Sequence, residues 1–255
     1  MARQRTPEGP PPPPAVQKIR LRYAKRGRLR FSSTRDFQRA LERALRRAGV
    51  PMAYSAGFHP HPKISYANAA PTGTASEAEY FEISVTEPVE PSRVAAALDE
   101  ALPDGIDVLE AADALPGSLA DRLQASEWIV ELRGLDADQR AQVERTVSAF
   151  LAAETVEISR MTKSGNRTFD VRSAVLALDL QGAAGRAAAS GVTVSTDAQL
   201  LRVLLRHTTP TVRPDDVITA LAATGEGLPQ ATPLMTRLVQ GLWSEADATV
   251  GDPLR

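Results

Sequence analysis

The 255-residue sequence contains no cysteine, only 5% aromatic residues, and no apolar run of the roughly 20 residues that a membrane helix requires. The absence of cysteine excludes disulfides, a cysteine nucleophile, thiolate zinc sites and a cysteine-bound iron–sulfur cluster in this chain. The low aromatic content weighs against a binding mode that stacks many bases. The N-terminus also lacks the apolar segment of a secretory signal, so we expect a cytoplasmic protein with no membrane contact.

Two nucleotide-binding motifs are missing as well. The sequence has neither a G-x-x-x-x-G-K-[ST] phosphate loop nor a G-x-G-x-x-G fingerprint, so nucleotide hydrolysis and dinucleotide chemistry are unsupported.

Basic residues are concentrated in one stretch. Between Lys18 and Lys63 there are thirteen Lys or Arg and two acids, Asp36 and Glu42, which gives a local charge of +11. The whole chain carries −1, so the remainder sums to −12. Such an asymmetry indicates a polyanionic partner, and we expect nucleic acid.

The first part of this stretch has the period of a β-strand. From Lys18 to Phe31 basic and apolar side chains alternate around Arg26 and Gly27, which are typical of a turn. We therefore expect a strand or hairpin whose solvent face is almost entirely positive.

A helix is predicted next. Ser33 with Asp36 is typical of an N-terminal cap, and Gly49 followed by Pro51 indicates the end. Phe37 begins an apolar face, and basic residues gather on the other side. Their i,i+4 spacing costs a helix a few tenths of a kcal/mol per like-charged pair, so we interpret the row as an anion-binding surface and not only as a solvated face. Arg35, Arg39, Arg43 and Arg46 gather on this side, and Arg35, Arg39, Arg43 and Arg47 follow one another at i,i+4.

The order of predicted elements indicates the fold. Residues 16–112 follow the order β-α-β-β-α-β of a ferredoxin-like domain, and the order recurs over residues 126–245 after a linker at 113–125. We therefore expect an α+β protein of two tandem ferredoxin-like domains. A disordered proline-rich tail at 1–15 and a frayed C-terminus at 246–255 complete the prediction. Residues 182–191 are predicted as a flexible link, and 200–205 as either strand or helix.

Aromatic, histidine and basic residues cluster after the basic helix. The prolines that follow His59 and His61 favour extended backbone, so both imidazoles should project from one side. In an RNA-binding module, Tyr54, Phe58, Tyr66 or the imidazoles would stack on bases, while basic side chains contact phosphates. A turn near residue 163 adds a second basic patch. The predicted RNA-binding residues are Lys25, Arg28, Arg30, Arg35, Arg39, Arg43, Arg46, Arg47, Tyr54, Phe58, His59, His61, Lys63, Lys163 and Arg167.

The histidines allow other interpretations. A metal-independent endoribonuclease could use His59 and His61 to transfer protons and Lys63 to stabilise the charged transition state. Alternatively, the imidazoles could simply cap backbone groups of a proline-rich turn. His59 and His61 with Glu77 or Glu79 could also hold a metal, but the chain has only three histidines, and we expect no metal or other cofactor.

The string AYSAGFHPHPKIS, with the dense similarity around it from Val16 to Val85, resembles the uncharacterised radical-SAM-associated family (domain of unknown function 2344). A thinner similarity continues to about Ala223, where TKSGNRTFDVR resembles the family's second basic turn. A His often follows the family's Ser pair, whereas Thr34 stands here, which puts a catalytic role for that position in doubt.

Members of this family occur alone, attached to radical-SAM proteins or encoded near them. The basic surface predicts RNA binding, with tRNA or rRNA as the partner. Taken with the resemblance, it predicts an accessory protein that assists a radical-SAM-linked RNA-modification system. The resemblance also allows an adaptor for a radical-SAM enzyme that makes no direct contact with RNA.

Overall fold

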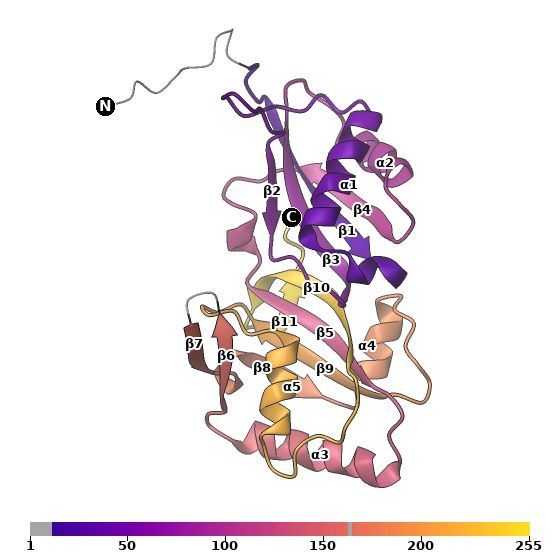
Figure 1. The fold of residues 1–255 in the computed structure, drawn as a ribbon, viewed down its shortest axis with the longest axis vertical. Coiled ribbons are helices and arrows are strands. Elements are labelled where there is room, and N and C mark those ends of the chain that lie inside the picture. Colours follow the sequence, from indigo (N-terminus) through magenta and orange to yellow (C-terminus); the bar gives the residue numbers. More distant parts are fainter. Residues whose placement is uncertain (1–11, 163–164) are drawn as a thin grey trace, which may run out of the picture. The chain divides into compact units, whose positions relative to one another are not determined.

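The computed structural model describes residues 12–162 and 165–255 (Figure 1). It is a mixed α+β structure with antiparallel strand pairing and, in the described ranges, five α-helices. The chain divides into two units, Met1–Asp121 with Leu254–Arg255, and Arg122–Pro253. Most of the predicted proline-rich tail, residues 1–11, lies outside the described residues. Across the described part of the chain, no helix has the length and apolar character to cross a bilayer.

The first unit contains an antiparallel sheet and two helices. β1 pairs with both β4 and β3, and β2 pairs with β3. A short 3-10 helix, Gly27–Phe31, follows β1. The elements in chain order are β1 Gln17–Lys25, α1 Thr34–Arg47, β2 Ile64–Ala67, β3 Ala75–Val85, α2 Pro91–Ala101 and β4 Ile106–Asp113.

Both helices of this unit cover the same face of its sheet (Figure 1). The alternation of β1 directs Ile19, Leu21 and Tyr23 into the core beneath them. The ring of Tyr23 stacks on Phe37 of α1, with centroids 4.3 Å apart. The apolar faces predicted for the strand and for the helix therefore pack against each other in one core.

The second half of the predicted opening hairpin is not a strand. Leu29 N–H donates to the Arg26 carbonyl and Ser32 N–H donates to the Leu29 carbonyl, which are the bonds of 3-10 turns. The reason lies in the sheet: β1 already has a partner on each side, so no edge is left for a hairpin strand. Residues 28–31 therefore do not form the positive strand face that the sequence predicts.

The strands of the second unit also pair antiparallel. β5 lies between β10 and β9, β8 pairs with β9, β11 pairs with β10, and β6 and β7 form a separate hairpin. The elements are β5 Ala125–Leu132, α3 Ala137–Ala152, β6 Glu157–Thr162, β7 Gly165–Asp170, β8 Val175–Asp179, α4 Ala183–Ala189, β9 Gln199–Arg206, α5 Pro214–Ala222, β10 Leu234–Ser244 and β11 Thr249–Gly251.

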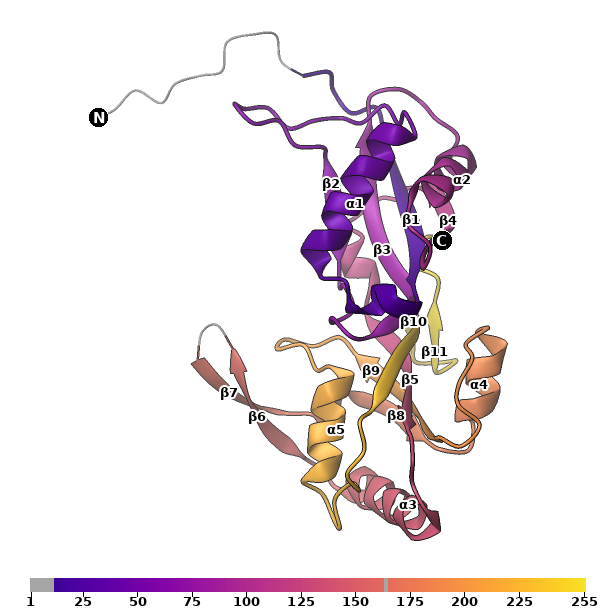
Figure 2. The ribbon, with the colours of Figure 1, turned by 45° about the vertical axis from the view of Figure 1, so that its right-hand side comes forward.

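Helices cover both faces of this second sheet (Figure 2). Trp128 and Val130 of β5 pack in the core that includes residues of α3 and α5, whereas Ile129 packs with α4. The predicted flexible link at 182–191 is wrong, because α4 buries Ala183 and Ala187 there. Its small side chains give too weak a periodic pattern for sequence reasoning to detect.

Two other sequence predictions, for residues 200–205 and for the C-terminus, can be compared with the structure. Residues 200–205 belong to strand β9. The C-terminal residues are paired instead of frayed, because β11 adds to β10 and Leu254 is buried.

Candidate functional site

Helix α1 presents a row of arginines that its own packing leaves free. The Ser33 hydroxyl accepts from Asp36 N–H at the N-terminus, as predicted, and Phe37 and Leu41 are buried against the sheet. This fixes the rotation of the helix, so that the opposite side faces solvent. There Arg35, Arg39, Arg43 and Arg46 are exposed and make no ion pair with any described residue.

The two acids of α1 leave this charge in place. Asp36 accepts a hydrogen bond from the Ser33 hydroxyl, 2.7 Å away, which is the main cause of its lowered pKa. Glu42 is spaced to pair with Arg46, but no ion pair forms between them. The row is thus a positive surface and not a salt-bridged helix face.

The chain between α1 and β2 forms a hairpin-like arm, defined here as residues 53–63. Lys63 N–H donates to the Ala53 carbonyl and Ser55 N–H donates to the His61 carbonyl, while Tyr54 forms an isolated bridge with Pro62. The arm projects from the rest of the unit near the C-terminal end of α1 (Figure 2). Phe58 at its tip is 61% exposed.

Arm and helix enclose a groove of about 240 Å³. Leu45 and Met52 form part of its floor, and Arg46, Tyr54 and His61 lie around it. Three of the predicted RNA-binding residues are thus brought to one place. His59 does not line the groove, so the groove does not bring the two histidines together. An endoribonuclease that uses both of them stays a prediction. The remaining lining residues are Glu42, Val50, Pro60 and Pro62.

Other basic residues of the predicted surface differ in availability. Arg28 and Lys63 are exposed without an ion pair among the described residues. Arg30 is half-buried and donates from Nε to the Gly73 carbonyl, and Arg47 donates to the Ala101 carbonyl. Arg28 and Lys63 therefore extend the α1 row, while Arg30 and Arg47 also bind the unit's own backbone.

The positive face expected on β1 is neutralised. Arg20 is 1% exposed and donates from Nε to Glu82 at 2.9 Å, and Lys18 Nζ lies 3.0 Å from the same carboxylate. Arg22 lies 3.7 Å from Glu110. The prediction that this strand offers a cationic surface is therefore wrong, because neighbouring strands supply carboxylates at matching positions.

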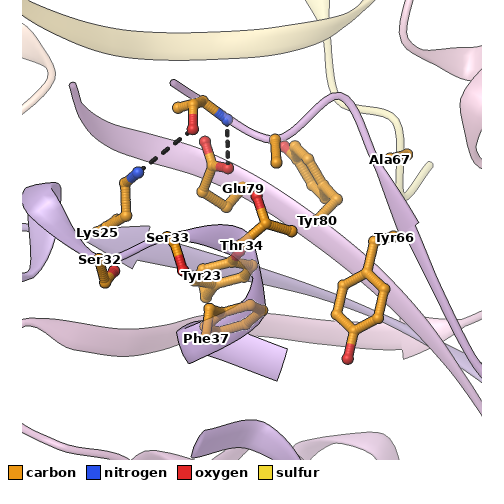
Figure 3. A pocket seen from close by; sticks show the side chains of 12 residues that line it. Tyr23, Lys25, Ser32, Ser33, Thr34, Phe37, Tyr66, Ala67, Glu79 and Tyr80 are labelled. Atoms are coloured by element: carbon orange, nitrogen blue, oxygen red, sulfur yellow. Dashed lines mark hydrogen bonds between the residues drawn. The ribbon is translucent and has the colours of Figure 1, made fainter. Parts of the chain in front are cut away.

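Lys25 is also unavailable as a phosphate contact. It is 5% exposed, and its Nζ donates to the carbonyls of Ala70 and Pro71. Figure 3 shows it with Glu79, whose carboxylate accepts from Ala70 N–H at 2.9 Å. The pocket around them measures about 20 Å³, space for about one water molecule. We assign this cluster to the interior of the unit.

Tyr66, one of the predicted stacking residues, belongs to the core. Its ring meets Phe37 edge-on at 6.2 Å. Burial, and next the charge of Glu42, raise the pKa of its hydroxyl above the ordinary value. The residue is half-buried and packs against the core of the unit.

The proposed metal ligands are not assembled. The described residues contain no group of three or more His, Asp or Glu side chains placed to hold an ion. Glu77 is paired with Arg26, and Glu79 is buried.

The second predicted basic patch lies on the β6–β7 hairpin. Arg167 is exposed there and has no ion pair with a described residue, while Lys163 lies outside the described residues. Arg160 pairs with Asp216 and contacts the face of Phe169, so it serves the packing of its own unit.

Sequence reasoning missed the apolar part of the groove. Leu45, Val50 and Met52 gave no functional signal because apolar residues usually indicate core. Only the contact between helix and arm reveals them as lining.

The chain was compared with known proteins. No curated protein is similar to it. A family model matches residues 18–214, which include α1, the arm and the β6–β7 hairpin. This match covers most of the 255 residues, and the chain therefore belongs to the bacterial family described as "uncharacterized protein conserved in bacteria (DUF2344)".

Proposed function

We propose that this protein binds RNA through α1 and the arm. The supporting observation is the row of exposed, unpaired arginines on α1. With Arg28 and Lys63, six exposed cations make no ion pair with a described residue: Arg28, Arg35, Arg39, Arg43, Arg46 and Lys63. Guanidinium groups bind phosphate oxygens through two parallel hydrogen bonds, so a phosphodiester chain is the ligand that this surface suits best.

Helix energetics also support this proposal. Arg35, Arg39 and Arg43 follow one another at i,i+4, where like charges oppose helix formation. No described carboxylate forms an ion pair with them, so repulsion along the row opposes the helix that carries it. Binding to a polyanion supplies a reason for such a row that stability does not. Phosphate contacts position an RNA without reading its sequence.

A wider role rests on family resemblance. We propose that the protein is an accessory of a radical-SAM-linked RNA-modification system, with tRNA or rRNA as the bound RNA. The chain has no cysteine to hold an iron–sulfur cluster, so the radical chemistry would belong to a partner protein. Crosslinking in cells, followed by sequencing of the bound RNA, tests this role. Recovery of no tRNA or rRNA would contradict it.

We further propose that each unit is a ferredoxin-like domain. The first unit has the element order β-α-β-β-α-β with strands in the order β4-β1-β3-β2. In the second unit the strands lie in the order β10-β5-β9-β8. This matches the strand order of the first unit once the β6–β7 hairpin and α4 are counted as insertions.

The salt dependence of RNA binding tests the central proposal. If six phosphates of a single strand are neutralised, the slope of log affinity against log salt should be about −4, so affinity falls about 300-fold between 50 and 200 mM salt. Arg39→Gln and Arg43→Gln should each reduce the slope by about 0.7. Arg93→Gln is the matched control, because Arg93 is also an exposed arginine but lies on α2. A slope near zero would overturn RNA binding.

A further inference from the structure

We infer that the groove between α1 and the arm holds the base of one unpaired nucleotide, with a preference for bases whose edge donates hydrogen bonds. This inference rests on the proposed RNA binding. It assigns a ligand class to the groove: an RNA with an unpaired residue, such as a bulge or an open strand, instead of a continuous duplex.

The groove has the apolar surfaces that a base needs. Leu45 and Met52 are buried beneath it, Pro60 and Pro62 line it from the arm, and Tyr54 presents a ring that is 37% exposed. Every base has two flat faces that stack on aromatic or apolar groups. The bridge with Pro62 holds the backbone of Tyr54, so the point from which the ring projects is set before a ligand arrives.

The groove also has polar groups suited to the rest of a nucleotide. Arg46 and His61 line it and have exposed side chains, so they can meet the phosphate next to the bound base. Among the described residues, Glu42 is the only acid that lines it, and no ion pair with any of them occupies its carboxylate. A carboxylate accepts from amino groups of a base edge and repels carbonyl oxygens. Guanine and cytosine should therefore be favoured over uracil.

The volume of the groove limits the number of bases that it can hold. At about 240 Å³ it is smaller than the roughly 300–1,000 Å³ of pockets that hold drug-sized ligands. A single base fits such a space better than two stacked bases. In a duplex, the bases are stacked and their edges are paired, so a duplex can contact the arginine row but cannot fill the groove.

Matched RNAs and matched variants test this inference. Affinity is measured at one salt concentration for a paired duplex, the same duplex with one bulged guanine, and the same with a bulged uracil. The wild-type protein should bind the guanine bulge about five- to hundred-fold more tightly than the paired duplex, with the uracil bulge between them. Tyr54→Ala should abolish this preference, so that the paired duplex and the two bulged duplexes bind with similar affinity. Glu42→Gln should remove the discrimination between guanine and uracil.

Two further variants keep the result interpretable. Phe58→Ala removes a more exposed aromatic ring from the same arm, but Phe58 does not line the groove, so the bulge preference should persist. Tyr54→Phe keeps the ring and should retain the preference, which distinguishes lost stacking from a distorted arm.

The outcomes separate the two proposals. If the RNAs bind with the expected salt slope but the bulge gives no advantage, or Phe58→Ala acts as strongly as Tyr54→Ala, the groove inference is overturned and RNA binding stands. If no RNA shows a salt-dependent affinity, RNA binding itself fails.

Discussion

Arg20 and Arg39 carry the same side chain in opposite surroundings. Arg20 is 1% exposed and bonded to Glu82, whereas Arg39 stands in solvent with no ion pair to a described residue. Both lie in the same basic stretch of the sequence. At the scale of single residues, the function of a cation therefore depends on whether a carboxylate reaches it.

We predict that Glu82→Gln lowers the free energy of unfolding at pH 7 by about 3–5 kcal/mol, because it leaves the buried Arg20 charge without its partner. Burial opposes ionisation of Glu82, but hydrogen bonds from Lys18 and Arg20 outweigh it and lower the pKa of the carboxyl. Its contribution is therefore full above the ordinary pKa of 4.5 and is lost as the pH falls through the lowered value. Urea unfolding at several pH values should show that the Glu82→Gln variant lacks this part of the wild type's acid sensitivity.

Glu110→Gln is the control for this substitution. Glu110 pairs with Arg22 and Arg255 at the surface, and such pairs contribute about 0–1 kcal/mol. An equal loss in the two variants would mean that burial of the Arg20 pair is not what matters.

At the scale of elements, α1 combines two demands. Its apolar side packs against the sheet, and its other side carries repelling charges. We predict that Arg39→Gln with Arg43→Gln leaves the free energy of unfolding unchanged or raises it by a few tenths of a kcal/mol, while RNA affinity falls. Chemical unfolding and RNA titration of the same preparations measure both effects.

The opposite pattern is expected from the N-terminal cap. Ser33→Ala removes the acceptor for Asp36 N–H and should cost about 1 kcal/mol of stability with little change in RNA affinity. If instead the two arginine substitutions destabilised the protein by more than the cap substitution, the row would have a structural role.

At the scale of the whole molecule, net charge is a poor guide to binding. The chain carries −1 at pH 7 and has a pI near 6.3, yet α1 and the arm form a cationic surface. We predict that Arg39→Gln with Arg43→Gln reduces the salt slope of RNA binding at pH 7.5 by about 1.4.

A variant with the same net charge provides the comparison. Arg145→Gln with Arg206→Gln also removes two positive charges, but Arg145 pairs with Glu226 and Arg206 with Glu245, each at 2.8 Å. This variant should keep the wild-type slope. Equal slopes for the two double variants would show that binding follows total charge and not the α1 surface.

The sequence by itself determined the elements whose signals are local. α1 has a cap, a stop and an apolar period within 17 residues. β1 alternates from Lys18 to Tyr23 and β3 from Phe81 to Val85, so these identities could be predicted from neighbouring residues. Helix α4 has no such pattern, since its residues are mostly alanine and glycine, and packing on Ile129 and Leu200 decides it.

Only the tertiary structure decided which cations are free and where they meet other groups. Glu82 lies 62 positions from Arg20 in the chain, and antiparallel pairing of β1 with β3 brings the two together. The groove likewise exists only because the arm folds back beside α1, which places Tyr54 and His61 near Arg46. Pairing of strands and packing of loops depend on contacts between residues distant in sequence, and a local pattern does not contain that information.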